Sequence, residues 1–261
     1  MGAVLSTMER GLHGSWIVLF FGTVGWNAGQ AEAAPMIVLA ARDAGFYRRR
    51  EGSAVELPNG DILLAWSRFS VAEGDDNGRS TIVAARSVDV GKTWSAPVEL
   101  PVGTAGASIR QAGVLPVKQG LTLSFSVRGG GKSAKYAIDS LEGGLTWSER
   151  RKLFEAGGPN DRVVRLRSGR IVMPAHRVSG RRIGGYEDLE VLVARGDDDG
   201  RTWELTPPLG HVRHPMEVRE SNAKPLKLHE PAVAELDDGR LLMLARSSAG
   251  ASTAPGRRTG A

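Results

Sequence analysis

Short apolar runs recur along the chain, and each follows a sequence typical of a tight turn. The turn sequence 57–61 leads into the apolar run 62–66, and the same order returns at 118–123, 167–173 and 237–244. Short apolar runs bounded by glycine-containing turns are typical of buried β-strands. No segment shows a long 3.6-residue periodicity that would indicate a helix. The pattern therefore predicts an all-β chain.

A second motif alternates with these runs and ends in Thr-Trp. It has the form S-x-D-x-G-x-T-W and occupies residues 87–94, 140–147 and 196–203, each time after a strand-like run. Repeats of roughly 50 residues, each with several strands and a turn signature, are typical of a β-propeller. The units of such an array bury their faces only against neighbouring units. We therefore expect one folding unit rather than separate domains.

The repeated motif resembles the Asp box of sialidases and related propellers. This resemblance implies a structural turn in which the Asp caps backbone N–H groups and the Trp packs between strands. Glu142 and Gly196 depart from the motif, so weaker turns are expected in the second and third copies. The resemblance to the sialidase superfamily extends over about residues 46–247, through three further segments: Tyr47–Arg50 ahead of Gly60, 158–175 and 230–246.

The resemblance implies substrate-binding and catalytic roles for several residues. Arg50 and Arg246 match two members of the arginine cluster that holds the carboxylate of a sialic acid, and Arg68 lines the pocket. Guanidinium groups bind carboxylates through charge-assisted, often bidentate, hydrogen bonds. Asp76 matches the general acid, with Asp75 as the alternative.

Glu230 matches the residue that makes a Tyr nucleophilic, in a glycosidase family that departs from the two-carboxylate scheme. Other interpretations stay open: segment 73–78 could be a solvated acidic loop, and Glu230 could be a buried Glu bound to backbone or Arg groups. His176 and His229 have no ligand partners at diagnostic spacing, so we expect structural or pocket-lining roles for them. No metal site and no cofactor is predicted.

The chain also departs from the family pattern. A sialidase propeller has six blades, whereas this sequence supplies about four, and its tyrosines, Tyr47, Tyr136 and Tyr186, all precede Glu230. Residues 248–261 are small, polar and rich in helix and strand breakers, which predicts a disordered tail. We therefore expect a C-terminally truncated sialidase-like protein that is inactive alone. Its open blade edges could favour self-association.

Composition and the N-terminus bear on partners and location. The net charge is +5 and the pI is about 9.8, but the cations are scattered among acids. This distribution argues against a nucleic-acid partner and suits an acidic glycan. The absence of cysteine excludes disulfides and thiolate metal sites.

The apolar stretch 16–25, followed by Ala31-Glu32-Ala33, fits a signal peptide over residues 1–33. The expected mature propeller is then 34–247, secreted or periplasmic, with no later membrane segment.

Two classes of function follow from these observations. The first is an exo-α-sialidase-type glycoside hydrolase that releases terminal sialic acids, or a hydrolase of the same superfamily that acts on another acidic sugar. The alternative is a non-catalytic propeller that serves as a glycan-binding or interaction module.

Overall fold

The chain folds entirely into β-strands where the structure describes it, as the sequence predicted. The computed structural model describes strands at 4–6, 18–20 and 37–38, and then residues 45–70, 78–103, 106–129, 132–156, 163–183, 186–209 and 226–249. Within these ranges no helix is both long and apolar enough to cross a membrane. The predicted signal peptide, residues 1–33, and the predicted tail, residues 248–261, lie largely outside the described residues, so both remain predictions. Residues 248 and 249 are the exception in the tail, because they end the last strand.

The strands form four sheets. A small sheet holds β1 (Val4–Ser6), β2 (Val18–Phe20) and β3 (Ile37–Val38). The largest sheet has eight strands in the order β11-β10-β9-β8-β6-β5-β4, with β7 paired to β6. Its strands are β4 (Phe46–Glu56), β5 (Ile62–Ser70), β6 (Ser80–Ser87), β7 (Val98–Glu99), β8 (Ser108–Val117), β9 (Gly120–Gly129), β10 (Lys132–Ser140) and β11 (Arg151–Phe154).

The two remaining sheets come from the C-terminal part of the chain. The third sheet has the order β12-β13-β14-β15, and the fourth contains only β16 and β17. Their bounds are β12 (Val164–Arg165), β13 (Ile171–Ile183), β14 (Tyr186–Gly196), β15 (Glu204–Leu205), β16 (Leu226–Glu235) and β17 (Leu241–Ala249).

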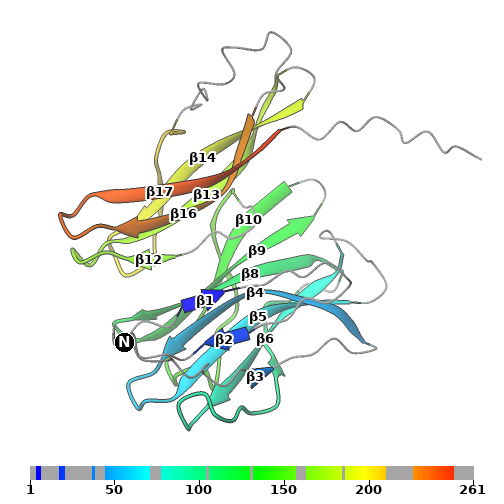
Figure 1. The fold of residues 1–261 in the computed structure, drawn as a ribbon, viewed down its shortest axis with the longest axis vertical. Helices are drawn as coiled ribbons and strands as arrows, with labels where there is room; N and C mark the ends of the chain where they lie inside the picture. Colours follow the sequence, from blue (N-terminus) through cyan, green and yellow to red (C-terminus); the bar gives the residue numbers. More distant parts are fainter. Residues whose placement is uncertain are drawn as a thin grey trace, which may run out of the picture.

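The eight-stranded sheet consists of two antiparallel units that meet at a single parallel pair, Ser80 with Ser108. We call β4–β7 the first unit, β8–β11 the second, β12–β15 the third and β16–β17 the fourth. Each unit begins with a strand, a tight turn and a returning strand, as the turn-then-strand pattern predicted. In Figure 1 strands β8–β10 lie between β4–β6 and the strands of the last two units.

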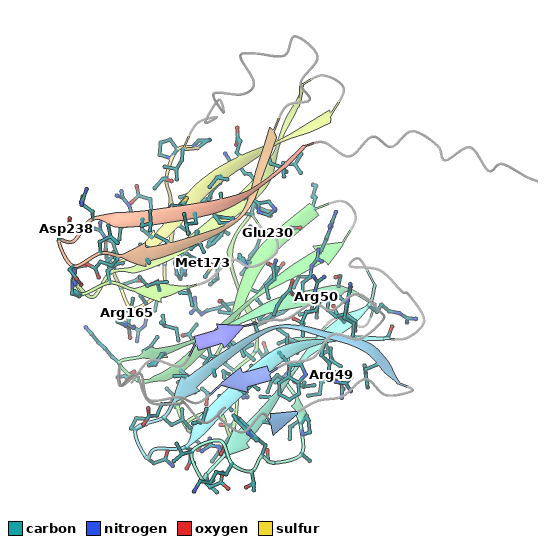
Figure 2. The ribbon with its side chains drawn as sticks, in the orientation of Figure 1. Arg49, Arg50, Arg165, Met173, Glu230 and Asp238 are labelled. Carbon is teal, nitrogen blue, oxygen red and sulfur yellow. The ribbon has the colours of Figure 1, made fainter. Side chains whose placement is uncertain are left out.

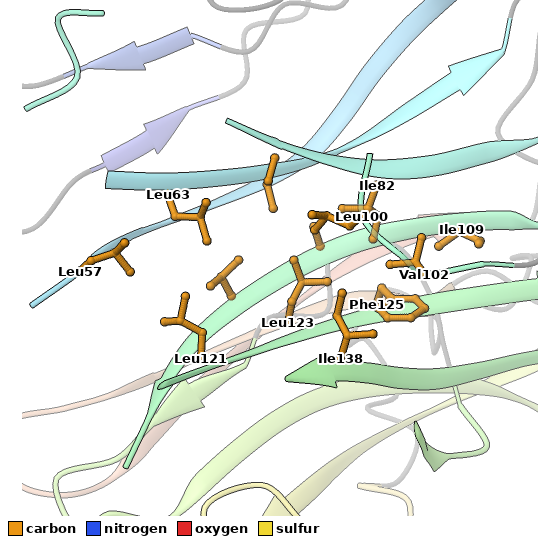
Figure 3. Packing of buried hydrophobic residues seen from close by; sticks show 14 residues of the cluster. Leu57, Leu63, Ile82, Leu100, Val102, Ile109, Leu121, Leu123, Phe125 and Ile138 are labelled. Carbon is orange, nitrogen blue, oxygen red and sulfur yellow. The ribbon is translucent and has the colours of Figure 1, made fainter. Parts of the chain in front are cut away.

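The main hydrophobic core lies between the first two units. Strand alternation turns one face of β5 and β6 toward one face of β8, β9 and β10, and apolar residues occupy these facing positions. Ile82, Leu123 and Ile138 are completely buried there, in one cluster with Phe125, and Figure 3 shows these side chains gathered between the strands. A separate cluster around Met173 and Leu192 fills the third unit. The units are thus fixed by buried side chains as well as by backbone pairing.

The first Thr-Trp turn, at 87–94, has the capping that the sequence predicted. Asp89 accepts hydrogen bonds from the Thr93 N–H at 2.8 Å and from the Thr93 hydroxyl at 2.6 Å. These bonds lower the pKa of Asp89 to about 2. The Trp94 indole N–H donates to the Gly91 carbonyl at 3.0 Å, and its ring packs on the cluster around Trp66. The turn therefore closes the strand pair and extends the core.

The other two turns keep part of this network. The Glu142 carboxylate accepts only from the Thr146 hydroxyl, at 2.7 Å, among the described residues. Asp198 accepts from both the N–H and the hydroxyl of Thr202, at 2.9 and 2.6 Å. The third turn has Gly196 where the first has Ser87, whose hydroxyl accepts from the Gly91 N–H at 2.7 Å. Each variant turn lacks a hydrogen bond that the first turn makes.

Val90 should be a source of strain in the first turn. Its φ is 59°, a left-handed conformation that is rare for β-branched residues, whereas the equivalent residues of the other turns are Gly143 and Asp199. Left-handed backbone costs an ordinary residue about 1–2 kcal/mol, and Asn tolerates it better. We therefore expect Val90→Asn to raise the free energy of unfolding by about 1 kcal/mol in chemical denaturation.

Val88 provides the matched control for this variant. It is exposed like Val90 and lies in the same turn, but its φ is not positive. Val88→Asn should leave stability unchanged. Equal effects of the two substitutions would show that the strain at Val90 is not the cause.

Candidate functional site

Three residues occupy the same unusual backbone position in different units. Glu51, Gln111 and Glu230 have φ values of 57°, 66° and 55°. Each lies on the first strand of its unit, at a shift in the pairing register. An extra residue in one strand makes a β-bulge, which bends the strand and re-aims a side chain. Bulges with left-handed non-glycine residues concentrate at functional sites.

The residues beside the bulges are also equivalent. Arg50 pairs with Ser67, Arg110 with Ser126, and His229 with Arg246. The backbone of Arg246 therefore holds the same place in the fourth unit that Ser67 and Ser126 hold in the first two. Figure 2 shows Arg50 and Glu230 toward the right of the view, away from Arg165 and Asp238 near the turns on the left. The bulges thus lie toward the end of the sheets opposite the tight turns.

A buried polar group joins the bulges of the first two units. The Glu51 carboxylate accepts a hydrogen bond from the Gln111 N–H at 3.1 Å, and the same N–H lies 3.0 Å from the Ser67 hydroxyl. Burial raises the pKa of Glu51 above its ordinary value of 4.5, and the charges of Arg110, Arg50 and Lys135 oppose this rise. One carboxyl group therefore faces three cations. We call Arg50, Glu51, Arg110, Gln111 and Lys135 the inner cluster.

The Gln111 side chain has a fixed orientation in the inner cluster. Its Oε1 accepts from the Ser126 hydroxyl and from the Lys135 ammonium, 3.3 Å away. Because a Lys side chain can only donate, the atom facing Lys135 must be the amide oxygen. The amide nitrogen then points elsewhere, and it is buried with no hydrogen-bond partner among the residues that the structure describes. Lys135 is 1% exposed, so this contact is shielded from water.

Glu230 is held against the third unit. Its backbone N–H donates to Nδ1 of His176, at 3.3 Å, across the boundary between β16 and β13. His176 is buried, and its Nδ1 must be unprotonated to accept this bond. The expected structural role of His176 is therefore specific: it caps the backbone at the Glu230 bulge.

The structure places the other predicted site residues as follows. Arg68 lies on β5 but not in the inner cluster: its guanidinium binds Glu99 at 3.0 Å and lies 3.7 Å from the centre of the Phe46 ring. Arg246 is described only as backbone in β17. Asp75 and Asp76 lie outside the described residues.

Sequence reasoning missed Glu51, Arg110, Gln111 and Lys135. A signal for Glu51 and Gln111 was present, because both stand nine positions before a turn glycine, as Glu230 does. Arg110 stands ten positions before Gly120, as Arg50 does before Gly60. Lys135 carried no such signal. Its burial follows from contacts with distant strands. Within the part of the chain that the structure describes, no group of three or more His, Asp or Glu residues could hold a metal ion.

Comparisons with known proteins agree with this architecture. No family model matches the sequence. A sialidase of Micromonospora viridifaciens is 25% identical over 241 residues, which cover 78% of this chain and 34% of the sialidase. The chain thus spans about a third of the length of that relative.

The fold is also similar to solved structures of sialidases and of other glycoside hydrolases. The Hadza microbial sialidase Hz136 has a TM-score of 0.53 at 14% identity, covering 82% of this chain and 50% of the sialidase. An α-L-arabinofuranosidase from Lactobacillus brevis has a TM-score of 0.59 at 12% identity, covering 85% of this chain and 74% of that one. The fold is therefore the β-propeller-like fold shared by sialidases and other glycoside hydrolases.

Glu51 should make the stability of the fold depend on pH. Because its pKa is raised in the folded state, the protonated form favours folding, and this stabilisation is complete below pH 4.5. It is lost as the pH rises through the raised pKa. Glu51→Gln removes the ionisation, so the variant should gain stability relative to the parent as the pH rises above 4.5 in denaturation experiments.

Glu56 serves as the control for this substitution. It lies on the same strand but is exposed. Glu56→Gln should give no comparable pH-dependent difference from the parent. A parallel pH profile for Glu51→Gln and the parent would contradict the burial argument.

Proposed function

We propose that this chain carries the substrate-binding region of a sialidase-type glycoside hydrolase that acts on a terminal acidic sugar. The observation that supports the proposal is the inner cluster, where the charges of Arg50, Arg110 and Lys135 act on the Glu51 carboxyl group at the bulges of the first two units. Guanidinium groups bind carboxylates through charge-assisted hydrogen bonds, so a cluster that holds Arg50 and Arg110 suits an acidic sugar. The relative of 25% identity is itself named a sialidase, which makes sialic acid the first candidate.

In the proposed reaction the sugar carboxylate binds to Arg50, and Arg246 supplies a second guanidinium. Asp76 donates its proton to the glycosidic oxygen as the bond to the leaving group breaks. A Tyr oxygen forms the bond to the anomeric carbon while Glu230 accepts the Tyr proton, and water then releases the sugar with retained configuration. These roles rest on the sequence resemblance.

One observation favours glycan binding without hydrolysis as a second candidate. Tyr136 packs against Phe125 with ring centres 6.1 Å apart, and Arg150 lies 5.0 Å from its ring centre. Its ring thus belongs to the main core, so Tyr136 does not serve as the nucleophile. Binding of the acidic sugar is therefore the property that both candidates share, and it is the first to test.

Arg50→Met should weaken binding of N-acetylneuraminic acid to the purified chain. A hydrogen bond to a charged group contributes about 1.5–3 kcal/mol, so we expect the dissociation constant to rise about tenfold to hundredfold. Isothermal titration calorimetry measures the change. Arg240→Met is the control, because Arg240 is an exposed arginine in the turn that joins β16 and β17.

Hydrolysis separates the two candidates. Release of the fluorophore from a fluorogenic sialoside, lost in Arg50→Met and in Asp76→Ala, would support the hydrolase. Binding of the sugar without release would agree with the glycan-binding module and equally with a hydrolase whose nucleophilic Tyr this sequence does not supply after Glu230. If Arg50→Met and Arg240→Met bind N-acetylneuraminic acid as tightly as the parent, the inner cluster is not the carboxylate site.

A further inference from the structure

The Glu51 carboxyl group is the acidic member of the inner cluster. The charges that act on it come from Arg50 on its own strand, from Arg110 on β8 and from Lys135 on β10. Arg110 and Lys135 are buried, so water and salt screen these charges less than they would at the surface. Glu51 is therefore the internal counter-ion of cations from three strands.

The two oxygens of this carboxyl group have different surroundings. Oε2 lies 3.1 Å from the Gln111 backbone nitrogen, which donates to it, and 3.5 Å from the Ser67 hydroxyl oxygen. No hydrogen bond from the described residues falls on Oε1. A carboxyl group that gains a proton on one oxygen keeps the other as an acceptor. Glu51 can therefore take up a proton at Oε1 and still accept the hydrogen bond of the Gln111 N–H at Oε2.

The contacts of Glu51 also oppose a movement of its side chain out of the cluster. Glu51 lies at a bulge with a left-handed backbone, at a φ of 57°. If its carboxyl group turned away, the Gln111 N–H would keep only the Ser67 hydroxyl, 3.0 Å away. A buried donor that loses an acceptor destabilises the fold. Protonation in place is therefore the smaller change when a second negative charge arrives.

A carboxylate that binds to Arg50 brings such a charge. It shares the cations of the cluster with Glu51, and two like charges in one shielded site raise the pKa of the carboxyl group that is already there. Burial already raises the pKa of Glu51 above its ordinary value of 4.5. The bound anion and the burial of Glu51 thus act in the same direction.

We propose that Glu51 couples binding at the inner cluster to proton uptake: its carboxyl group takes a proton from solvent when the carboxylate of an acidic sugar enters. The inference rests on the proposed function for the identity of the ligand. One negative charge arrives with the sugar and one proton arrives from solvent, so the net charge of the cluster is unchanged. Between the Glu51 pKa of the free chain and that of the ligand-bound chain, affinity for the sugar should fall by up to about tenfold per pH unit.

The test is isothermal titration calorimetry of the full chain with N-acetylneuraminic acid at a series of pH values above 4.5. Repeating each titration in two buffers of different ionisation enthalpy gives the number of protons taken up. The parent should take up a proton and lose affinity as the pH rises. Glu51→Gln keeps an oxygen for the Gln111 N–H but cannot titrate, so it should bind the sugar without proton uptake and with a flat pH profile.

Two features of the chain make this variant informative. Gln111 occupies the equivalent bulge of the second unit with a φ of 66°, so a glutamine side chain is compatible with this backbone position. Glu56→Gln is the matched control, because Glu56 is an exposed residue of the same strand and lies outside the inner cluster. It should show the proton uptake and the pH profile of the parent.

Acetate, a small carboxylate, separates this inference from the proposed function. NMR of the Glu side-chain carboxyl carbons follows the titration of Glu51, whose signal is the one missing from Glu51→Gln. If acetate at constant ionic strength moves this titration to higher pH and N-acetylneuraminic acid does not bind, the coupling stands and the acidic-sugar function fails. If the sugar binds to the parent without proton uptake, or with equal uptake to Glu51→Gln, the function stands and the coupling is overturned. A Glu51 titration that neither ligand moves would also overturn the coupling.

Discussion

The backbone N–H groups at two of the bulges have acceptors outside their own strand ladders, and these bonds join neighbouring units. The Gln111 N–H donates to Glu51 and Ser67 of the first unit, and the Glu230 N–H donates to His176 of the third. A buried N–H without an acceptor would cost about 1–3 kcal/mol. In both cases one unit presents a polar side chain to the bulge of the next, which places polar groups at this end of the sheets.

The same bulges carry strain that a glycine would relieve. A left-handed conformation costs an ordinary residue about 1–2 kcal/mol, yet Glu51, Gln111 and Glu230 all retain a carboxyl or carboxamide group there. Glycine would adopt the backbone freely but would remove the Glu51 oxygen that receives the Gln111 N–H. It would likewise remove the Gln111 oxygen that receives Lys135. At these two positions the side chain contributes contacts that offset the backbone strain.

The sequence predicted the strands better than it predicted the inner cluster. The apolar run 62–66 lies within β5 and the run 171–173 begins β13, because strand signals are local. The bulge contacts join residues 60 positions apart, which no local pattern encodes. Lys135 lies in β10, but its burial depends on contacts with another strand, among them Gln111. The equal spacing of nine residues from each bulge residue to the glycine of the following turn was the sequence feature that indicated the bulges.

Arg68 illustrates how one residue step separates two kinds of chemistry. The sequence resemblance grouped Arg68 with Arg50 as pocket residues, but side chains alternate between the two faces of a strand. Ser67 faces the inner cluster through Gln111, and its neighbour Arg68 turns to Glu99 and Phe46. A single strand, β5, thus supplies a hydroxyl to the inner cluster on one face and an arginine, already paired to a carboxylate, on the other. Arg68 therefore does not share the environment of Arg50, although the two lie on paired strands.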